Sequence, residues 1–164
     1  RLAAAVTHYQ TIKETFLYHA WRMEATRREV ISGDNLFLKE NIKAYNTDYT
    51  VGDFRLLTLV PGALQVPFRM QQQEAPAGVL SITWEASPWV SRQRNKDTFM
   101  LAVIYDDEPF RMEIIENTGI TRLDGTATIP LAKAGAGKAH VYAFFTNETR
   151  DAFTNNVYFN VKLE

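Results

Sequence analysis

Cysteine is absent from the sequence, which excludes disulfide bonds, thiolate nucleophiles and cysteine-ligated zinc or iron sites. Long apolar runs are absent as well. None approaches the ~20 residues of a membrane-spanning helix, and no signal-peptide pattern is present. The chain begins at Arg1 rather than at methionine, so we expect a segment upstream of it, which would carry any targeting signal. Without disulfide bonds, stability must come from packing. Without a long apolar run, no membrane span is expected.

Net charge is also small, at −1 for 164 residues. No whole-molecule field would attract nucleic acid or an anionic membrane, so nucleic acid is not an expected partner. The aromatic share of 12% is high and favours strands with large inward side chains. A chain of this size buries roughly 70% of its unfolded surface, enough for one substantial domain or two small ones that share an interface.

Glycine and proline are missing between Leu2 and about Val30, where apolar residues recur three and four positions apart. The apolar positions are Leu2, Val6, Tyr9, Ile12, Phe16, Ala20 and Met23. The opposite side carries the charged residues Lys13, Glu14, Arg22, Glu24, Arg27 and Arg28. This pattern predicts one long amphipathic helix. Ser32-Gly33 would end it, because glycine readily adopts the left-handed conformation that closes a helix.

A second, shorter helix is predicted after this stop. Asp34 or Asn35 would cap it, and it would run to about Tyr45 with Leu36, Phe37 and Ile42 facing inward. The stretch YTVGDFRLLTLVPG, residues 49–62, then predicts a connecting strand that ends in a Pro-Gly turn. Residues 1–62 are therefore interpreted as a helical pair followed by a strand.

The remaining residues, 63–164, have the pattern of an all-β unit. Seven short strands are predicted, each bounded by Gly, Pro, Asn or Asp: Leu64–Met70, Val79–Glu85, Thr98–Asp106, Phe110–Ile115, Leu123–Pro130, Lys138–Thr146 and Ala152–Lys162. This number and spacing of strands is typical of an immunoglobulin-like antiparallel β-sandwich. We place the last strand at or near a sheet edge.

Alternation along these strands predicts which side chains are buried. In GVLSITWEAS, residues Leu80, Ile82 and Trp84 would share one face. In HVYAFF, one face carries Val141, Ala143 and Phe145, and the other carries Tyr142 and Phe144. Because both faces are apolar, we expect the helices to cover the outer one. The rings of this segment are then interpreted as core rather than as a ligand platform.

The pattern of SITWEAS, MLAVIYDD and VYAFFTNETRDAFTNNVYFNV is similar to a fibronectin type III-like or immunoglobulin-like sandwich. Over nearly the whole chain, the order of features resembles an uncharacterised family of unknown function that is typical of Bacteroidetes. The matching segments are Asn35-Leu36-Phe37 with Asn41, Gly62-Ala63-Leu64, and Tyr142 to Tyr158. The resemblance implies a Gly-rich, basic segment upstream of Arg1, and it brings no established activity.

Catalytic motifs are not found. GAGKA at residues 135–139 lacks two positions of a phosphate-binding loop, because Ala132 and Ala139 stand where that motif needs glycine and Ser or Thr. His8 and His19 would lie on nearly the same helical face but about 16 Å apart, too far to share a metal. His140 is alone at a strand start, and no serine has a nucleophile-elbow context. We therefore predict no enzyme, no cofactor and no metal site.

Two surface patches are weighed as sites. Asp106, Asp107 and Glu108 form either a calcium loop or a solvated hairpin turn, and the turn is favoured because no EF-hand spacing is present. SRQRNKD places Arg92, Arg94 and Lys96 near Trp89, so these four residues are the candidate contacts with a ligand or partner, the alternative being an ordinary inter-strand loop. Asn147-Glu148-Thr149 matches a glycosylation acceptor, which matters only in a secretory pathway.

The sequence thus predicts an α+β protein in which an N-terminal helical pair packs on a seven-stranded immunoglobulin-like sandwich. Scarce reactive groups, together with edge strands and a long helix, favour a structural or adhesive subunit of a bacterial surface or phage-derived assembly. Other protein chains, including copies of itself, would be its partners. Such a role would place it outside the cell, on the cell surface or in a virion-like particle. The alternative is a carbohydrate-binding module that uses Trp89 and neighbouring loop residues.

Overall fold

The computed structural model describes residues 1–86, 91–132 and 137–164. Three α-helices occupy the N-terminal segment: α1 (Leu2–Lys13), α2 (Leu17–Arg27) and α3 (Gly33–Asn41). A 3-10 turn, η1 (Ile42–Ala44), follows α3. The prediction of a helical pair is therefore wrong, because its first member is two helices.

Thr15 accounts for the break between α1 and α2. Its hydroxyl donates to the carbonyl of Ile12 at 2.8 Å and accepts from the N–H of Leu17 at 3.2 Å. A threonine that bonds the backbone in this way competes with the regular helical pattern. The bend also directs Phe16 onto the ring of Phe153, which it stacks at a centroid distance of 6.2 Å. Tertiary packing and a local side-chain bond thus override the helical periodicity.

Ser32-Gly33 begins a helix rather than ending one, so the predicted stop is also wrong. The hydroxyl of Ser32 caps α3 by accepting from the N–H of Asn35 at 3.1 Å. Gly33 is required for close packing, because a Cβ there would lie 2.6 Å from the hydroxyl of Tyr9 and 3.3 Å from Trp21. This close approach brings the start of α3 against α1 and α2.

The predicted connecting strand over residues 49–62 is not formed. Val51 makes a single bridge to Tyr45, and the chain then turns into a 3-10 helix, η2 (Phe54–Leu56). The side chain of Asp53 caps η2 by accepting from the N–H of Arg55 at 2.9 Å. The apolar residues that follow are buried, but in an extended segment without a neighbouring strand.

In the described residues, seven strands form two antiparallel sheets. The three-stranded sheet has the order β1-β2-β5, with β1 (Gln71–Gln72), β2 (Val79–Thr83) and β5 (Thr126–Pro130). The four-stranded sheet has the order β4-β3-β6-β7, with β4 (Glu113–Ile115), β3 (Thr98–Tyr105), β6 (Lys138–Thr146) and β7 (Val157–Lys162). A short helix, α4 (Arg92–Asn95), precedes β3, and a 3-10 turn, η3 (Arg122–Asp124), precedes β5. The predicted α+β class is confirmed.

Most predicted strands contain an observed strand, and the faces are as predicted. Leu80, Ile82 and Trp84 are buried in one cluster. The predicted strand Leu64–Met70 is the exception, because among the described residues it contributes only one parallel bridge, from Leu64 to Thr154. The hairpin of β3 and β4 is confirmed by antiparallel pairing of its two strands.

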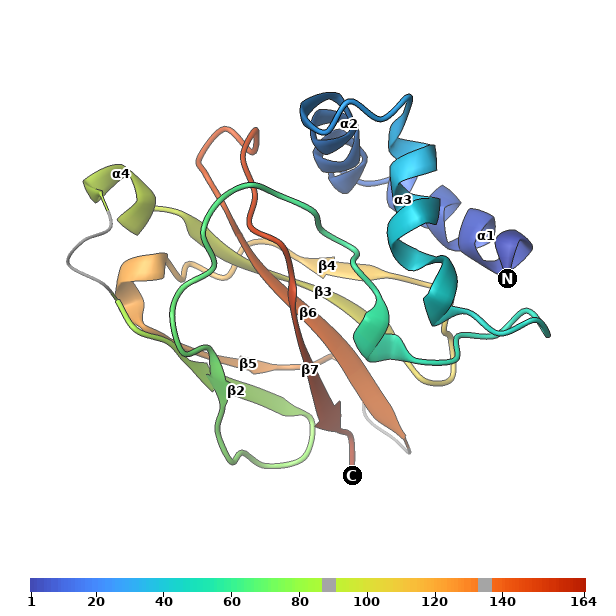
Figure 1. The fold of residues 1–164 in the computed structure, drawn as a ribbon. Helices are drawn as coiled ribbons and strands as arrows, with labels where there is room; N and C mark the ends of the chain where they lie inside the picture. The colour runs from blue at the N-terminus through green and yellow to red at the C-terminus, as the bar shows by residue number, and fades with distance from the viewer. Residues whose placement is uncertain (87–90, 133–136) are drawn as a thin grey trace.

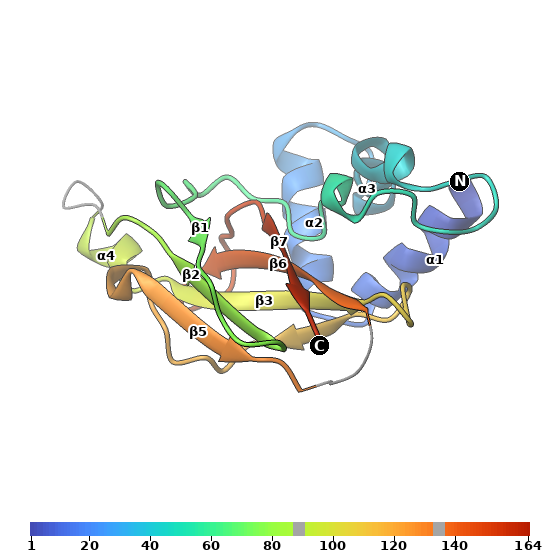
Figure 2. The same ribbon diagram turned by 90° about the horizontal axis from the view of Figure 1, so that it is seen from below.

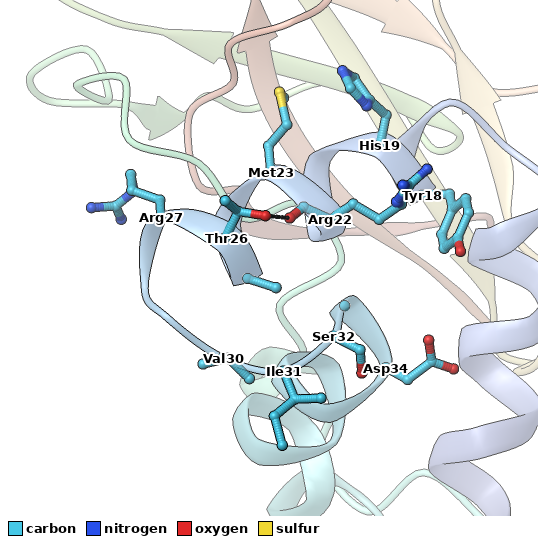
Figure 3. A pocket seen from close by; sticks show the side chains of 12 residues that line it. Tyr18, His19, Arg22, Met23, Thr26, Arg27, Val30, Ile31, Ser32 and Asp34 are labelled. Atoms are coloured by element: carbon cyan, nitrogen blue, oxygen red, sulfur yellow. Dashed lines mark hydrogen bonds between the residues drawn. The ribbon is translucent and has the colours of Figure 1, made fainter.

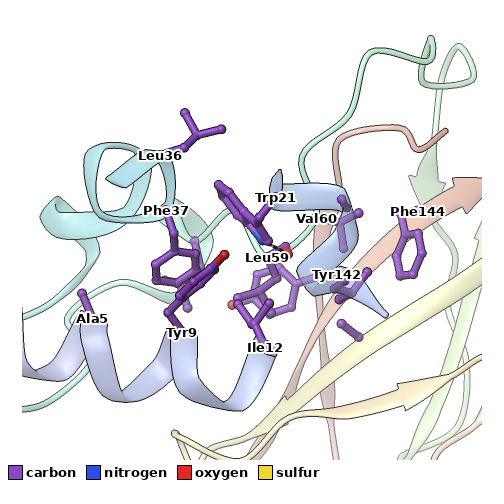
Figure 4. Packing of buried hydrophobic residues seen from close by; sticks show 14 of the residues in the cluster. Ala5, Tyr9, Ile12, Trp21, Leu36, Phe37, Leu59, Val60, Tyr142 and Phe144 are labelled. Carbon is purple, nitrogen blue, oxygen red and sulfur yellow. Dashed lines mark hydrogen bonds between the residues drawn. The ribbon is translucent and has the colours of Figure 1, made fainter. Parts of the chain in front are cut away.

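The helices cover one face of the four-stranded sheet, as Figures 1 and 2 show. Tyr142 and Phe144 of β6 share a buried cluster with side chains of all three N-terminal helices, in agreement with the prediction. Figure 4 shows Trp21 beside Phe37 in this cluster, with ring centroids 5.1 Å apart and an angle of 73°. The indole N–H of Trp21 donates to the carbonyl of Leu59 at 2.9 Å. The helical segment and the sheet therefore share one core.

A second buried cluster is built from the other face of β6 and from the three-stranded sheet. Phe145 and Phe99 meet Trp84 within it, and the Trp84 and Phe145 ring centroids lie 5.2 Å apart at 79°. The indole N–H of Trp84 donates to the carbonyl of Arg122 at 2.7 Å. Both faces of β6 are thus covered.

Candidate functional site

Three of the four residues of the predicted basic patch, Arg92, Arg94 and Lys96, lie on or directly after α4. Trp89 lies outside the described residues. Arg94 reaches back to Asp97, with its Nε 3.6 Å from a carboxylate oxygen, and is therefore turned inward. Arg92 and Lys96 are exposed. Lys96 borders a groove on the four-stranded sheet.

Asp97 belongs to a buried ion pair that sequence reasoning missed. Its side chain is 1% exposed, and an Nη2 atom of Arg122 lies 3.5 Å from its carboxylate. Burial raises the pKa of Asp97 and lowers the pKa of Arg122. The same Nη2 donates to the carbonyl of Gln65 at 2.8 Å. The pair thus ties three segments of the chain together, which is a structural role.

His140 is not alone, in contrast to the prediction. Its Nδ1 shares a hydrogen bond with the hydroxyl of Tyr158 at 2.6 Å, and its Nε2 contacts the carboxylate of Asp106. The ring of Phe54 stacks on the imidazole with centroids 3.7 Å apart and an angle of 5°. Both nitrogens and one face of this buried ring are occupied, so metal binding or proton transfer to a substrate would require breaking these contacts.

Asp106 is also engaged by the backbone, because its other carboxylate oxygen accepts from the N–H of Lys138 at 3.0 Å. The predicted acidic turn therefore supplies one of its carboxylates to the end of the sheet. In the part of the chain that the structure describes, no three His, Cys, Asp or Glu residues are grouped to hold a metal ion. Residues 135 and 136 of the rejected phosphate-loop motif lie outside the described residues.

His8 and His19 lie on different helices, so the predicted shared face does not exist. His8 is fully buried, and its Nδ1 shares a hydrogen bond with the hydroxyl of Tyr45 at 2.8 Å. Burial lowers the pKa of His8 to about 4. The imidazole is therefore neutral at physiological pH and fills space in the helical core. His19 is exposed on α2.

β7 is an edge strand of the four-stranded sheet, as predicted for the last strand. The carbonyl of Lys162 accepts from the N–H of Gly78 at 2.8 Å, and the carbonyl of Asn160 accepts from the side chain of Gln72 at 2.7 Å. Both carbonyls therefore point away from β6. Alternate residues of an antiparallel strand direct their backbone groups to the same side. The backbone of Tyr158 faces outward as well.

Three N–H groups, those of Tyr158, Asn160 and Lys162, thus form a row along β7. No residue in the described part of the chain accepts a hydrogen bond from them. A groove of about 420 Å³ runs between this row and the segment that follows β1, and Glu74 and Pro76 line its far wall. This strip of backbone donors beside a groove is the candidate site, and we call it the β7 edge.

Two asparagines determine where the β7 edge begins. The side-chain oxygen of Asn156 accepts from the N–H of Val60 at 3.0 Å, and its backbone N–H donates back to the Val60 carbonyl at 3.0 Å. Asn155 accepts from the N–H of Gly62 at 2.9 Å. Gly62 must lack a side chain, because a Cβ would lie 1.9 Å from the carbonyl oxygen of Phe153. The segment after η2 therefore covers the chain up to β7 and does not extend along β7 itself.

The sequence predicted the edge strand, but it did not predict that the segments after η2 and after β1 would flank it. They come from positions far away in the chain, and no spacing in the sequence indicates that they would meet β7.

No protein-family model matches the chain, and a comparison with curated proteins finds no significant match. Among the described residues, no helix is both long and apolar enough to span a membrane.

Proposed function

We propose that this protein is a non-catalytic structural or adhesive subunit, of a bacterial surface or phage-derived assembly, that joins other protein chains through the β7 edge. Its two sheets would form an immunoglobulin-like sandwich that acts as a rigid support for this edge. The first partner to consider is a second copy of the same chain.

The outward N–H row of Tyr158, Asn160 and Lys162 is the observation that carries this proposal. Unpaired backbone donors on an edge strand are a template for an added strand from another chain. Proteins that avoid such pairing place charges, proline or bulges on their edges. Here Lys162 is the one charged residue of β7. The Gln72 amide on the Asn160 carbonyl is a flexible side chain that an incoming strand would displace.

The contacts of two histidine side chains support a role without catalysis. The imidazole of His140 is held by Asp106 and Tyr158 beneath Phe54, and that of His8 is sealed in the core. Each of these groups stabilises the fold through contacts that a catalytic group would have to leave.

Proline substitutions in β7 test the proposal. The N–H of Asn160 points outward, so Asn160→Pro removes one docking donor and leaves the ladder with β6 intact, as proline is tolerated on edge strands. Val157 is in the opposite phase, so its N–H points toward β6 and Val157→Pro would damage the fold. We expect light scattering to show self-association of the wild type at micromolar concentration, and a folded, monomeric Asn160→Pro variant. A wild type that remains monomeric contradicts self-assembly through this edge.

A second candidate function is carbohydrate binding, which a polar groove of about 720 Å³ on the helix-covered face of the four-stranded sheet favours. Lys96, Asn117 and Glu148 line it, and in the described part of the chain their side chains have no ion pair or hydrogen bond. Such a set of donors and acceptors suits sugar hydroxyls. A glycan array would test this function. Saturable binding that is lost in Asn117→Ala supports it, and no binding by the wild type argues against it.

A further inference from the structure

A third groove, of about 660 Å³, lies between α2 and the segment that leads into α3. Figure 3 shows Arg22 extending from α2 toward Tyr18, with Asp34 nearby, while Val30 and Ile31 lie on the facing segment. We call this the interhelical groove. It lies on the helices and is separate from the β7 edge.

The exposed side of α2 is basic because its acidic residue is turned inward. The side chain of Glu24 is 6% exposed, and its two carboxylate oxygens accept from Arg27 at 2.7 Å and from Arg28 at 2.9 Å. Arg22 is exposed and has no ion pair in the described part of the chain. Its guanidinium instead lies over the ring of Tyr18, 5.6 Å from the centroid. This arginine is therefore available to a partner's carboxylate.

The carboxylate of Asp34, on the opposite side of the groove, does not neutralise Arg22. Asp34 is already paired with Lys13, whose Nζ lies 2.9 Å from its carboxylate. The ammonium of Lys13 also lies 5.8 Å from the centroid of the Tyr18 ring. One end of the groove thus carries Arg22 and the ring of Tyr18, together with a carboxylate, Asp34, that Lys13 already neutralises.

The apolar part of the groove is presented by an ordered segment. Ile31 is 93% exposed, although both of its neighbours are fixed. The N–H of Val30 donates to the carbonyl of Ala25 at 2.8 Å, and Ser32 caps α3. An isoleucine held out in solvent by ordered neighbours is a ready contact for another apolar side chain, and its burial would favour association.

We infer that the interhelical groove binds an acidic peptide segment of a partner protein, with a carboxylate on Arg22 and an apolar side chain against Ile31 and Val30. Charge complementarity identifies the occupant as acidic. The apolar wall favours a peptide over a nucleic-acid backbone, which has no aliphatic side chains to place there. This inference does not depend on the proposed role of the β7 edge.

The test uses the whole chain and a short fluorescein-labelled peptide in which glutamates alternate with leucines. Fluorescence anisotropy should show saturable binding by the wild type that weakens as salt is raised. Arg22→Glu should lower the affinity at least about tenfold, because a charge-assisted hydrogen bond is lost. Ile31→Ser should lower it as well. Both residues are exposed, so both variants should fold, which circular dichroism checks.

Arg55→Glu is the matched control, since Arg55 is an exposed arginine on η2 without an ion pair in the described residues. It should leave the affinity unchanged. The inference is overturned if the wild type does not bind the peptide, or if Arg22→Glu and Arg55→Glu have equal effects. It is overturned equally if a peptide with serine in place of leucine, or single-stranded DNA, binds as tightly, because the groove would then select charge alone.

Discussion

The imidazole of His140 and the phenol of Tyr158 are joined by a hydrogen bond of 2.6 Å on the helix-facing side of the sheet. Tyr142, one position along the same face, donates its hydroxyl to the carbonyl of Phe54 at 2.7 Å. The two tyrosine rings meet edge to face, with centroids 5.5 Å apart. Hydrogen bonds of tyrosine hydroxyls therefore stabilise the part of the core that lies under η2. Their ionisation should decide how stable the protein is in alkaline solution.

Stability should fall in alkaline solution. Burial raises the pKa of Tyr142 and of Tyr45 well above their ordinary range, and it raises the pKa of Tyr158 as well. The unfolded chain then loses phenolic protons above pH ~10 while the native state keeps them. The free energy of unfolding should be flat below that pH and decrease above it, by up to about 1.4 kcal/mol per pH unit for each tyrosine.

Urea unfolding between pH ~8 and ~11 measures this slope. Tyr142→Phe should make it shallower, at the cost of about 1 kcal/mol at neutral pH for the lost hydrogen bond. Tyr49→Phe is the control, because Tyr49 is 46% exposed and should leave the slope unchanged. A slope that Tyr142→Phe does not alter would contradict the assignment.

Stability should also fall in acidic solution. His8 has its pKa lowered from 6.5 to about 4 by burial, so the unfolded chain binds a proton before the native state does. Its contribution to stability is complete above pH 6.5, decreases as the pH falls toward 4, and is constant below that. The total change is on the order of 3 kcal/mol. His8→Gln should remove this dependence, and the exposed His19→Gln should retain it, as unfolding curves across this pH range will show.

Trp84 tests the second cluster. Its indole is 6% exposed and packs on Phe99 and Phe145, so Trp84→Ala should lower the free energy of unfolding by about 3–5 kcal/mol. Leu123 is 61% exposed, and Leu123→Ala should change stability by less than about 0.5 kcal/mol. Denaturant unfolding compares the two. Equal effects would mean that Trp84 is not a core residue.

Asn156 tests the segment that limits the β7 edge. Its side-chain oxygen accepts from the N–H groups of both Leu59 and Val60, at 2.8 and 3.0 Å. Asn156→Ala should cost about 2–4 kcal/mol, because two partly buried donors lose their acceptor. The neighbouring Asn155→Ala removes one exposed bond, to Gly62, and should cost less. Thermal unfolding compares the two variants, and the midpoint of Asn156→Ala should be the lower one.

Strand faces were predictable because their signal is local. The alternation around Leu80 and Val141 specifies which side chains share a face, and the structure buries them accordingly. The helix break was not predictable in the same way. The periodicity of residues 2–23 continues through Thr15 without interruption, and the bend depends on where Phe16 packs in the folded protein. Tertiary contact prevailed over local pattern.

The surroundings of His140 were missed for a similar reason. Asp106, Tyr158 and Phe54 belong to three segments that meet only when β3, β6 and β7 pair and η2 covers them. No spacing in the sequence indicates such a meeting. The extended segment after η2 is predicted as a strand from its apolar residues and its Pro-Gly end, yet asparagine side chains rather than a neighbouring strand satisfy its backbone.

The packing of the N-terminal helices on β6 and Phe153 also bears on biosynthesis. The first helices leave the ribosome long before the residues that cover them, since Tyr142, Phe144 and Phe153 all lie far along the sequence from α1 and α2. Until those residues emerge, the apolar faces of α1 and α2 have no sheet to pack on. The nascent chain should therefore depend on chaperones until β6 and Phe153 have left the ribosome, and truncation before β6 should yield an aggregation-prone product rather than a smaller folded unit.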